Sequence, residues 1–511
     1  MDEKQFTRME SRSLNLIAQA CGGRLLRPVS GGATPVHRIC TDSRQAKPGD
    51  LFFALKGDRF DGHDFLKDVV HQGASALVVN QARSKSVSSI FDSSSPGCAV
   101  IEVGDTRIAL GRLGARYRQD FQLPIIAVGG SNGKTTTKDL LTAVLRQRFN
   151  TLCNETSFNN DIGVPLTLLS LEQTHQIAVL EVGTNHPGEL APLLRLIQPQ
   201  AGVITNIGRE HLEFFKDLAG VAQEEGWLAE LLPESGKLFV NGDNEWTETI
   251  CRRTKAQVVR VGLGPGNDWI ARDLQMDDSG VAFVVECRNE LRPPRSSSLS
   301  EFKVKIEQED DGRGRGRGRK AGFAGQYRVN LLGRHQVANA LLVIAAAAEF
   351  GLTPAEIRRG LLNCPPPKMR MQLWEINGVR VLDDAYNANA DSMLAALQTL
   401  HDLPCRGHRV AVLGDMAELG EHTAAAHEEI GRRTAQLSIA RLVAVGKMAA
   451  QTAAAAREAG LREVLEFPDL SGVASVIKAS VKAGDLVLLK ASRAAGFERL
   501  SEALRNSGGT Q

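Results

Sequence analysis

A glycine-rich turn between an apolar run and a helical pattern constrains this chain more than any other feature. Ile125–Val128 predicts a buried strand, and a helix is expected from Thr135 to about Gln147. A turn between a strand and a helix N-terminus can cradle phosphate, because its backbone N–H groups approach the oxygens closely. The expected nucleotide contacts are Gly130, Ser131, Asn132, Gly133, Lys134, Thr135 and Thr136.

Two side chains of this turn carry specific chemistry. Lys134 is suited to neutralising the β and γ phosphate oxygens, and the Thr135 hydroxyl is suited to binding Mg²⁺. The turn is one residue tighter than the general G-x-x-x-x-G-K-[ST] pattern, because Val128 stands where that pattern needs glycine. This departure points away from kinases and GTPases.

The chain alternates predicted strands and helices in three blocks. The first runs over 1–121, the second over 122–364, and the third over 365–511 after Pro365-Pro366-Pro367. Apolar strands such as 177–182, 202–205, 409–413 and 486–489 alternate with helical segments, which favours parallel α/β sheets. A length of 511 residues agrees with about three domains.

One segment of the second block has the composition of a flexible insertion. Residues 293–320 contain a serine cluster, an acidic run and Gly-Arg repeats. Such a segment cannot bury enough apolar surface to fold alone. An Arg-Gly tract can also bind RNA, but the neighbouring acids partly cancel its charge, so a surface insertion is favoured.

The overall composition excludes several classes of protein. The net charge is +2 and the eight cysteines form no C-x-x-C pair, so neither nucleic-acid binding nor a zinc site is indicated. The charged N-terminus lacks the apolar core of a secretory signal, and Ala340–Ala348 is too short to span a bilayer. We therefore expect a cytoplasmic monomer without membrane insertion.

Polar residues follow two further strands of the second block. Glu181 ends an apolar run, and His211 follows Asn206-Ile207-Gly208-Arg209-Glu210 after another. A carboxylate at the carboxyl end of a parallel strand lies at the ligand crevice. Beside a phosphate loop, we expect Glu181 to bind metal.

Motifs across most of the chain resemble those of the Mur ligase family. They include the tight Gly-Lys-Thr loop, Gly333–Ala340, Asp383–Met393 and Lys490-Ala491-Ser492-Arg493. The resemblance implies an α/β fold in three domains: an N-terminal UDP-binding domain, a central P-loop ATPase-like parallel sheet and a C-terminal Rossmann-like domain. It also implies ATP and Mg²⁺ as cofactors.

The resemblance assigns roles to individual residues. Thr135 and Glu181 would hold one Mg²⁺, and His211 would bind a second. Lys134, His211 and Arg370 would act in catalysis. His335 and Asn339 would lie near adenine, Arg370 near the phosphates, Asp384 on the ribose and Tyr386 near the nucleotide, while Asn159, Asn160, Ser43 and Arg44 would contact the other substrate.

Glu225 is a departure from the family pattern. The family has at this position a lysine that is carbamylated and helps to hold the second metal. A carboxylate offers the same charge and oxygen ligands, so we expect Glu225 to replace the carbamate, either directly or through water, and to act in catalysis without CO₂.

The resemblance also implies a reaction. The motif Asp383–Met393 is most similar to that of family members that join D-alanyl-D-alanine to UDP-N-acetylmuramoyl-tripeptide. The reaction runs through an acyl phosphate and serves peptidoglycan synthesis. The third residue of the tripeptide is open between diaminopimelate and lysine. Another Mur ligase or a folylpolyglutamate-type ligase is the alternative, although a D-N-P-R motif is not found. An RNA-binding NTPase is disfavoured by the near-neutral charge.

Overall fold

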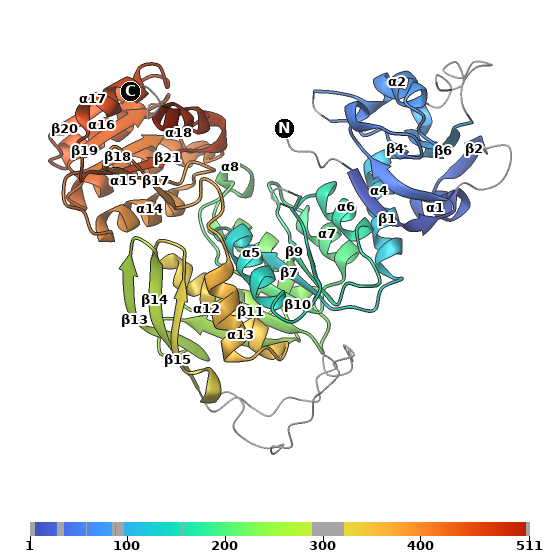
Figure 1. The fold of residues 1–511 in the computed structure, drawn as a ribbon, viewed down its shortest axis with the longest axis horizontal. Coiled ribbons are helices and arrows are strands. Elements are labelled where there is room, and N and C mark those ends of the chain that lie inside the picture. Colours follow the sequence, from blue (N-terminus) through green and yellow to red (C-terminus); the bar gives the residue numbers. More distant parts are fainter. Residues whose placement is uncertain are drawn as a thin grey trace.

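The computed structural model describes residues 6–27, 35–57, 59–83, 87, 97–155, 158–288 and 321–506. Three sheets follow one another along the chain, and each forms its own lobe in Figure 1, coloured blue, green to yellow, and orange to red. The insertion expected at 293–320 lies outside the described residues. Within them, no helix is long and apolar enough to cross a membrane.

The first lobe contains a six-stranded sheet in the order β1-β3-β4-β5-β6-β2. Its inner strands pair in parallel, and β1 and β2 add antiparallel edges. The strands are β1 (Phe6–Arg12), β2 (Arg24–Arg27), β3 (Val36–Cys40), β4 (Leu51–Phe53), β5 (Ala76–Asn80) and β6 (Ala99–Val103). The helices are α1 (Leu14–Cys21), α2 (Leu66–His71) and α4 (Thr106–Arg118).

The central lobe contains a nine-stranded sheet in the order β15-β14-β13-β12-β11-β10-β7-β9-β8. The strands are β7 (Ile125–Gly129), β8 (Thr151–Cys153), β9 (Ile177–Glu181), β10 (Ala201–Ile204), β11 (Lys237–Asn241), β12 (Gln257–Gly262), β13 (Trp269–Asp277), β14 (Gly280–Cys287) and β15 (Gly325–Val329). The helices are α5 (Lys134–Leu145), α6 (Gly163–Leu169), α7 (Leu190–Ile197), α8 (Leu212–Phe215), α9 (Leu218–Glu225), α10 (Trp227–Glu230), α11 (Thr247–Cys251), α12 (His335–Glu349) and α13 (Pro354–Asn363).

The expected parallel sheet is present, but its far edge is antiparallel. β13 pairs with β14, and β14 with β15, in antiparallel register. Along most of β14, residues of one face are buried while those of the other are partly exposed. That alternation is typical of an antiparallel strand with one wet face, whereas β7, β9 and β10 are buried throughout.

The C-terminal lobe contains a six-stranded sheet in the order β16-β17-β21-β18-β19-β20. All neighbours are parallel except the β16–β17 hairpin. The strands are β16 (Gln372–Ile376), β17 (Val379–Asp383), β18 (Arg409–Gly414), β19 (Arg441–Val445), β20 (Glu463–Phe467) and β21 (Leu486–Lys490). The helices are α14 (Ala390–Asp402), α15 (Thr423–Gln436), α16 (Ala449–Glu458), α17 (Val473–Ser480) and α18 (Glu498–Arg505).

Helix α4 joins the first two lobes into one apolar core. Its buried residues belong to the same cluster as α1 on one side and α6 and α7 on the other. At its end the Tyr117 hydroxyl donates a 2.8 Å hydrogen bond to the Leu171 carbonyl. The C-terminal sheet has two further clusters, one on each face. One of them also includes Leu332 and packs against Met276, both from the central lobe, so the two lobes share apolar contacts.

Candidate active site

The register of the central sheet brings three strand ends to one edge. Val128 of β7 pairs with Glu181 of β9, and Gly129 pairs with Ile204 of β10. The glycine-rich turn, Glu181 and the segment 205–211 therefore emerge side by side, as expected for a ligand crevice at the carboxyl ends of parallel strands. A cavity of about 810 Å³ opens here between the central and C-terminal lobes.

The glycine-rich turn has a backbone that other residues could not adopt easily. Gly130 has φ +105°, and a Cβ on it would lie 2.5 Å from the Thr205 hydroxyl oxygen. Gly133 has φ +89°, and a Cβ on it would lie 2.7 Å from Asn339 Oδ1. Both positions thus require glycine for conformation and for space. The turn ends at Lys134, the first residue of α5, so that helix N-terminus opens on the cavity.

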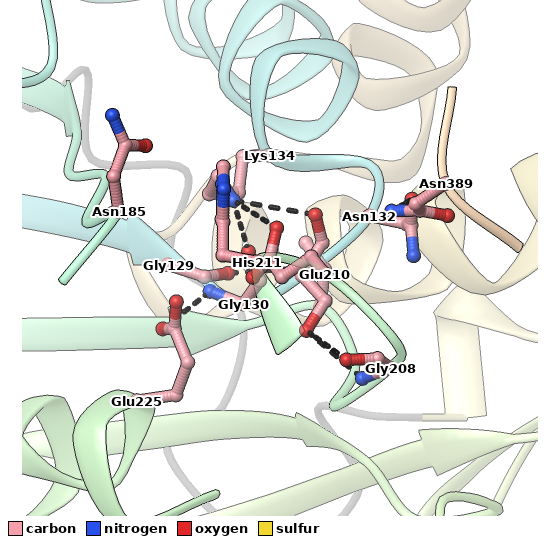
Figure 2. A network of polar contacts seen from close by, with 12 residues as sticks. Gly129, Gly130, Asn132, Lys134, Asn185, Gly208, Glu210, His211, Glu225 and Asn389 are labelled. Carbon is pink, nitrogen blue, oxygen red and sulfur yellow. Dashed lines mark hydrogen bonds and ion pairs between the residues drawn. The ribbon is translucent and has the colours of Figure 1, made fainter. Parts of the chain in front are cut away.

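Lys134 is held by the turn and by carboxylates. Its Nζ donates to the Gly130 carbonyl at 2.6 Å and to the Ser131 carbonyl at 3.2 Å, and it lies 3.2 Å from Glu210 Oε2 (Figure 2). Burial acts to lower the pKa of Lys134, but Glu210, Glu225 and Glu181 outweigh burial and the pKa is raised. The side chain therefore stays charged, as phosphate binding requires.

Glu181 is fixed from two sides at the floor of the cavity. Its Oε1 accepts from Asn159 Nδ2 at 2.9 Å, and its backbone N–H donates to Asn154 Oδ1 at 2.8 Å. Its Oε2 is buried and has no hydrogen-bond partner in the part of the chain that the structure describes. A buried carboxylate oxygen without a partner is costly, and together with Thr135 on the same cavity it fits a cation-binding role.

The residues expected around a second metal are arranged differently. His211 lines the cavity, but its Nδ1 lies 2.5 Å from Glu418 Oε2 of the C-terminal lobe. Glu225 is not among the lining residues: its Oε2 accepts from the Gly130 N–H at 2.7 Å, behind the turn (Figure 2). The Glu225 carboxylate thus contacts the turn here, and its expected role at a metal stays a prediction. Burial raises the pKa of Glu225 to about 7, against the lowering effect of Lys134.

No ready-made metal cluster of His, Cys, Asp and Glu occurs among the described residues. Nucleotide-bound Mg²⁺ commonly uses one or two protein oxygens together with phosphates and water. The side chains of Thr135 and Glu181 suffice for such a site. The roles of His211 and Glu225 at a second cation stay predictions.

A second wall of the cavity comes from α12 and the C-terminal lobe. His335 begins α12, and its Nε2 lies 3.0 Å from Gln336 Nε2, while Asn339 Nδ2 donates to Gln336 Oε1 at 2.9 Å. His335 is reached by solvent through the cavity, yet desolvation by the surrounding protein lowers its pKa to about 4. His335 is therefore neutral at neutral pH, which suits a contact with an uncharged base.

Asp384 and Lys490 form a charge pair in this wall. Lys490 Nζ lies 2.5 Å from Asp384 Oδ2, with 2% and 12% of the two side chains exposed. The other Asp384 oxygen accepts from the Met371 N–H at 3.1 Å. Asp384 is thus held rigidly at the cavity edge, and Lys490 is a site residue that we did not predict.

Two arginines contact one aromatic ring on the C-terminal side. The guanidinium carbons of Arg370 and Arg493 lie 4.1 and 5.3 Å from the centroid of the Tyr386 ring. Such contacts fix a guanidinium without neutralising it. Met369 and Met371 flank Arg370 with φ of +57° and +52°, so the backbone is strained where it enters this lobe.

Direct contacts join the two sides of the cavity. Asn389 Nδ2 of the C-terminal lobe donates to Asn132 Oδ1 of the turn at 2.9 Å. Arg209 lies 2.7 Å from Asp391 and 2.6 Å from Glu429, both on the C-terminal lobe. Polar side chains from residues far apart in the sequence therefore connect the two sides of the cavity.

Three residues expected to contact the substrate either lie away from this cavity or form hydrogen bonds with the protein backbone. Ser43 and Arg44 do not line this cavity, and Arg44 is bound to Asp42 on the surface of the first lobe. Asn160 lines the cavity, but its Oδ1 accepts from the Gly163 N–H at 2.9 Å at the start of α6. Asn159 lies on the cavity and holds Glu181.

Sequence reasoning missed several residues of the site. Glu210, Asn389 and Arg493 all line the cavity with Lys490. Each lies within or next to one of the motifs named above, so the motifs indicate the segments in which these residues occur. Which member of a motif faces the cavity depends on the packing of the lobes, and a single sequence does not reveal it.

The fold and the cavity define a class: a three-lobed α/β protein with a phosphate loop facing a separate C-terminal lobe. Family models match along the chain: "Mur ligase family, catalytic domain" over 35–118, "Mur ligase middle domain" over 128–347 and "Mur ligase, glutamate ligase domain" over 369–493. The chain belongs to the Mur ligase family, and it is a ligase.

The sequences and structures of individual relatives match this chain over nearly its full length. The UDP-N-acetylmuramoyl-tripeptide–D-alanyl-D-alanine ligase of Escherichia coli K12 is 34% identical over 98% of this chain and 100% of its own. The Bacillus subtilis protein of the same name is 32% identical over 98% and 99%. A crystal structure of MurF from Acinetobacter baumannii superposes with a TM-score of 0.82 at 29% identity, covering 98% of this chain and 100% of that one.

Proposed function

We propose that this ligase joins D-alanyl-D-alanine to UDP-N-acetylmuramoyl-tripeptide in the cytoplasm, with conversion of ATP to ADP and phosphate. The names of its full-length relatives support the substrates. The observation that carries the chemistry is the cavity in which the phosphate loop faces Arg370, Asp384 and Arg493 across the two lobes. The product would be the UDP-muramoyl-pentapeptide precursor of peptidoglycan.

The reaction must activate a carboxylate before an amine can attack it. Transfer of the γ-phosphoryl group of ATP to the tripeptide carboxylate gives an acyl phosphate and ADP. The dipeptide amine then attacks the acyl carbon, a proton is released, and phosphate leaves. Phosphoryl transfer is favoured by positioning and by charge neutralisation rather than by covalent help from the protein.

The residues of this chain supply both effects. Lys134 and the N-terminus of α5 would bind the β and γ phosphates, with Gly130, Ser131, Asn132, Gly133, Thr135 and Thr136 forming the loop. Arg370, held on Tyr386, would approach the phosphates from the other lobe. His335 and Asn339 would contact the base, and Asp384, fixed by Lys490, the ribose hydroxyls.

Mg²⁺ fits the Thr135 hydroxyl and the unpartnered Glu181 oxygen. When bound, it would offset the repulsion between the phosphate and substrate carboxylate. Asn159 would keep Glu181 oriented towards it, through the 2.9 Å hydrogen bond to Oε1. Ser43 and Arg44 on the first lobe are proposed for the UDP end of the substrate.

The test is phosphate release from ATP with UDP-muramoyl-tripeptide, with and without D-alanyl-D-alanine. We expect release only when both are present, together with a product heavier than the tripeptide substrate by the dipeptide less water. Both the diaminopimelate and the lysine tripeptide should be tried. Turnover with a different amine, and none with this dipeptide, would keep the ligase chemistry and reject the substrate assignment.

A further inference from the structure

The last two residues of α9 are glutamates that hold two different segments of the central lobe, of which only one belongs to the phosphate turn. Glu224 and Glu225 are both buried, with 4% and 1% exposed. Successive residues of a helix point about 100° apart, so the two carboxylates reach different neighbours. Glu224 accepts from the N–H groups of Gly188 and Leu190 at 2.9 and 2.8 Å, at the start of α7.

Glu225 reaches the back of the phosphate turn instead. Its Oε2 accepts from the Gly130 N–H at 2.7 Å (Figure 2). The Gly130 N–H is directed away from the cavity, so a bound phosphate does not reach it in this arrangement. A buried backbone N–H without an acceptor is strongly disfavoured. Glu225 therefore accepts a hydrogen bond from a backbone N–H that the turn directs away from the cavity.

Both backbone groups of Gly130 are held by largely buried side chains. Its N–H donates to Glu225, and its carbonyl accepts from Lys134 Nζ at 2.6 Å. A Cβ added to Gly129 would lie 2.9 Å from Glu225 Oε2, so the carboxylate is packed directly against the strand end. The contacts that the structure gives Glu225 Oε2 are therefore with the turn and the end of β7, while Oε1 is buried without a hydrogen-bond partner among the described residues.

We propose that Glu225 is a positioning residue that holds the Gly130 turn in its nucleotide-binding form before ATP or a cation arrives. It acts through the turn and not as a cation ligand. The inference rests on the proposed use of ATP at this site. It replaces the expectation that this carboxylate stands in for a carbamylated lysine at the metal.

The test measures ADP affinity by calorimetry, first in EDTA and then with saturating Mg²⁺, for Glu225→Ala, Glu225→Gln and the native protein. We expect Glu225→Ala to weaken metal-free ADP binding by roughly tenfold, since about one charge-assisted hydrogen bond is lost. Glu225→Gln should weaken it less, because the amide oxygen can still accept from Gly130. The gain in affinity on adding Mg²⁺ should be the same in all three proteins.

Glu224→Gln is the matched control, because it alters the neighbouring glutamate but not the turn. Its metal-free ADP affinity should stay within about twofold of native. Unchanged metal-free affinity in Glu225→Ala, combined with loss of the Mg²⁺ gain, would make Glu225 a cation ligand and overturn the proposal. If Glu225→Ala does not fold, loss of the Mg²⁺ gain in Glu225→Gln would overturn it in the same way. Failure of the native protein to bind ADP would instead reject the proposed function.

Discussion

At the scale of single residues, the Lys490–Asp384 pair is a short, largely buried charge contact in the cavity wall. Lys490 is almost fully enclosed and also donates to the Asn387 carbonyl at 3.1 Å. Removing one partner of a buried pair leaves the other charge without compensation, which typically costs more than the pair contributes. Both residues come from strand ends of the C-terminal sheet, so a change in the pair should alter the stability of this lobe.

We expect Lys490→Met to lower the free energy of unfolding of the C-terminal lobe by about 3 kcal/mol. Asp384→Asn should also destabilise it, because Lys490 then lies beside a neutral amide. The double variant should lose clearly less than the sum of the two, since no buried charge remains unpaired. Urea unfolding of all four proteins completes the cycle. Additive losses would show that the two side chains are not coupled.

The same residues show what a single sequence reveals about a site. Lys134, Glu181, His211, His335, Asn339, Arg370, Asp384 and Tyr386 were named from motifs, and the structure gathers all of them on one cavity. Their catalytic and binding roles stay predictions. Glu225 was assigned to the cavity as well, but its direction depends on how α9 packs under β7, which no local pattern encodes.

At the scale of elements, the start of α14 contributes both to stability and to the site. Asn389 is its N-cap, with a capping box in which Asn389 and Ser392 each accept from the other's backbone. The same side chain donates to Asn132 of the phosphate turn. Helix α13 has a comparable capping box at Thr353 and Glu356, and Thr353 does not line the cavity.

This pair of helices allows a matched comparison. We expect Asn389→Ala and Thr353→Ala each to lower the free energy of unfolding by about 1 kcal/mol, because each removes one N-cap. Only Asn389→Ala should also reduce phosphate release, by roughly fivefold, since it removes one hydrogen bond between the lobes. Urea unfolding and the two-substrate assay measure the two effects. Equal activity in both variants would mean that the Asn389–Asn132 contact does not contribute to turnover.

Elements with uniform burial were predicted well, and edge elements were not. The strand expected at 125–128 is β7, and those expected at 409–413 and 486–489 are β18 and β21, each within one or two residues. The antiparallel edge β13–β15 and the edge strand β16 were missed. Their partly exposed residues give a weaker apolar signal than a fully buried strand. The boundaries proposed at 121/122 and 364/365 stay predictions.

At the scale of the whole molecule, Arg209 connects the central lobe to two helices of the C-terminal lobe. Its guanidinium contacts Asp391 on α14 and Glu429 on α15, and the Asp391 carboxylate also accepts from the Arg209 backbone N–H at 2.7 Å. These side chains are partly exposed, so salt screens their attraction. Arg209 therefore forms an ion-pair network that holds the two lobes together.

Arg209→Ala should therefore loosen the lobes in the absence of nucleotide. We expect a larger radius of gyration by small-angle X-ray scattering, and a similar but smaller increase in the native protein at high salt. Arg253→Ala is the control, because Arg253 pairs with Glu230 inside the central lobe. If Arg209→Ala and Arg253→Ala scatter identically, the Arg209 ion-pair network does not determine the arrangement of the lobes.

The strand order of the C-terminal sheet has a consequence for synthesis of the protein. β21 is the last strand of that sheet along the chain, yet it lies in the middle, between β17 and β18. Until the ribosome has delivered Leu486–Lys490, the earlier strands form two unconnected pieces with exposed edges. The first two lobes can fold during translation, whereas the third cannot complete its sheet before Leu486–Lys490 has left the ribosome.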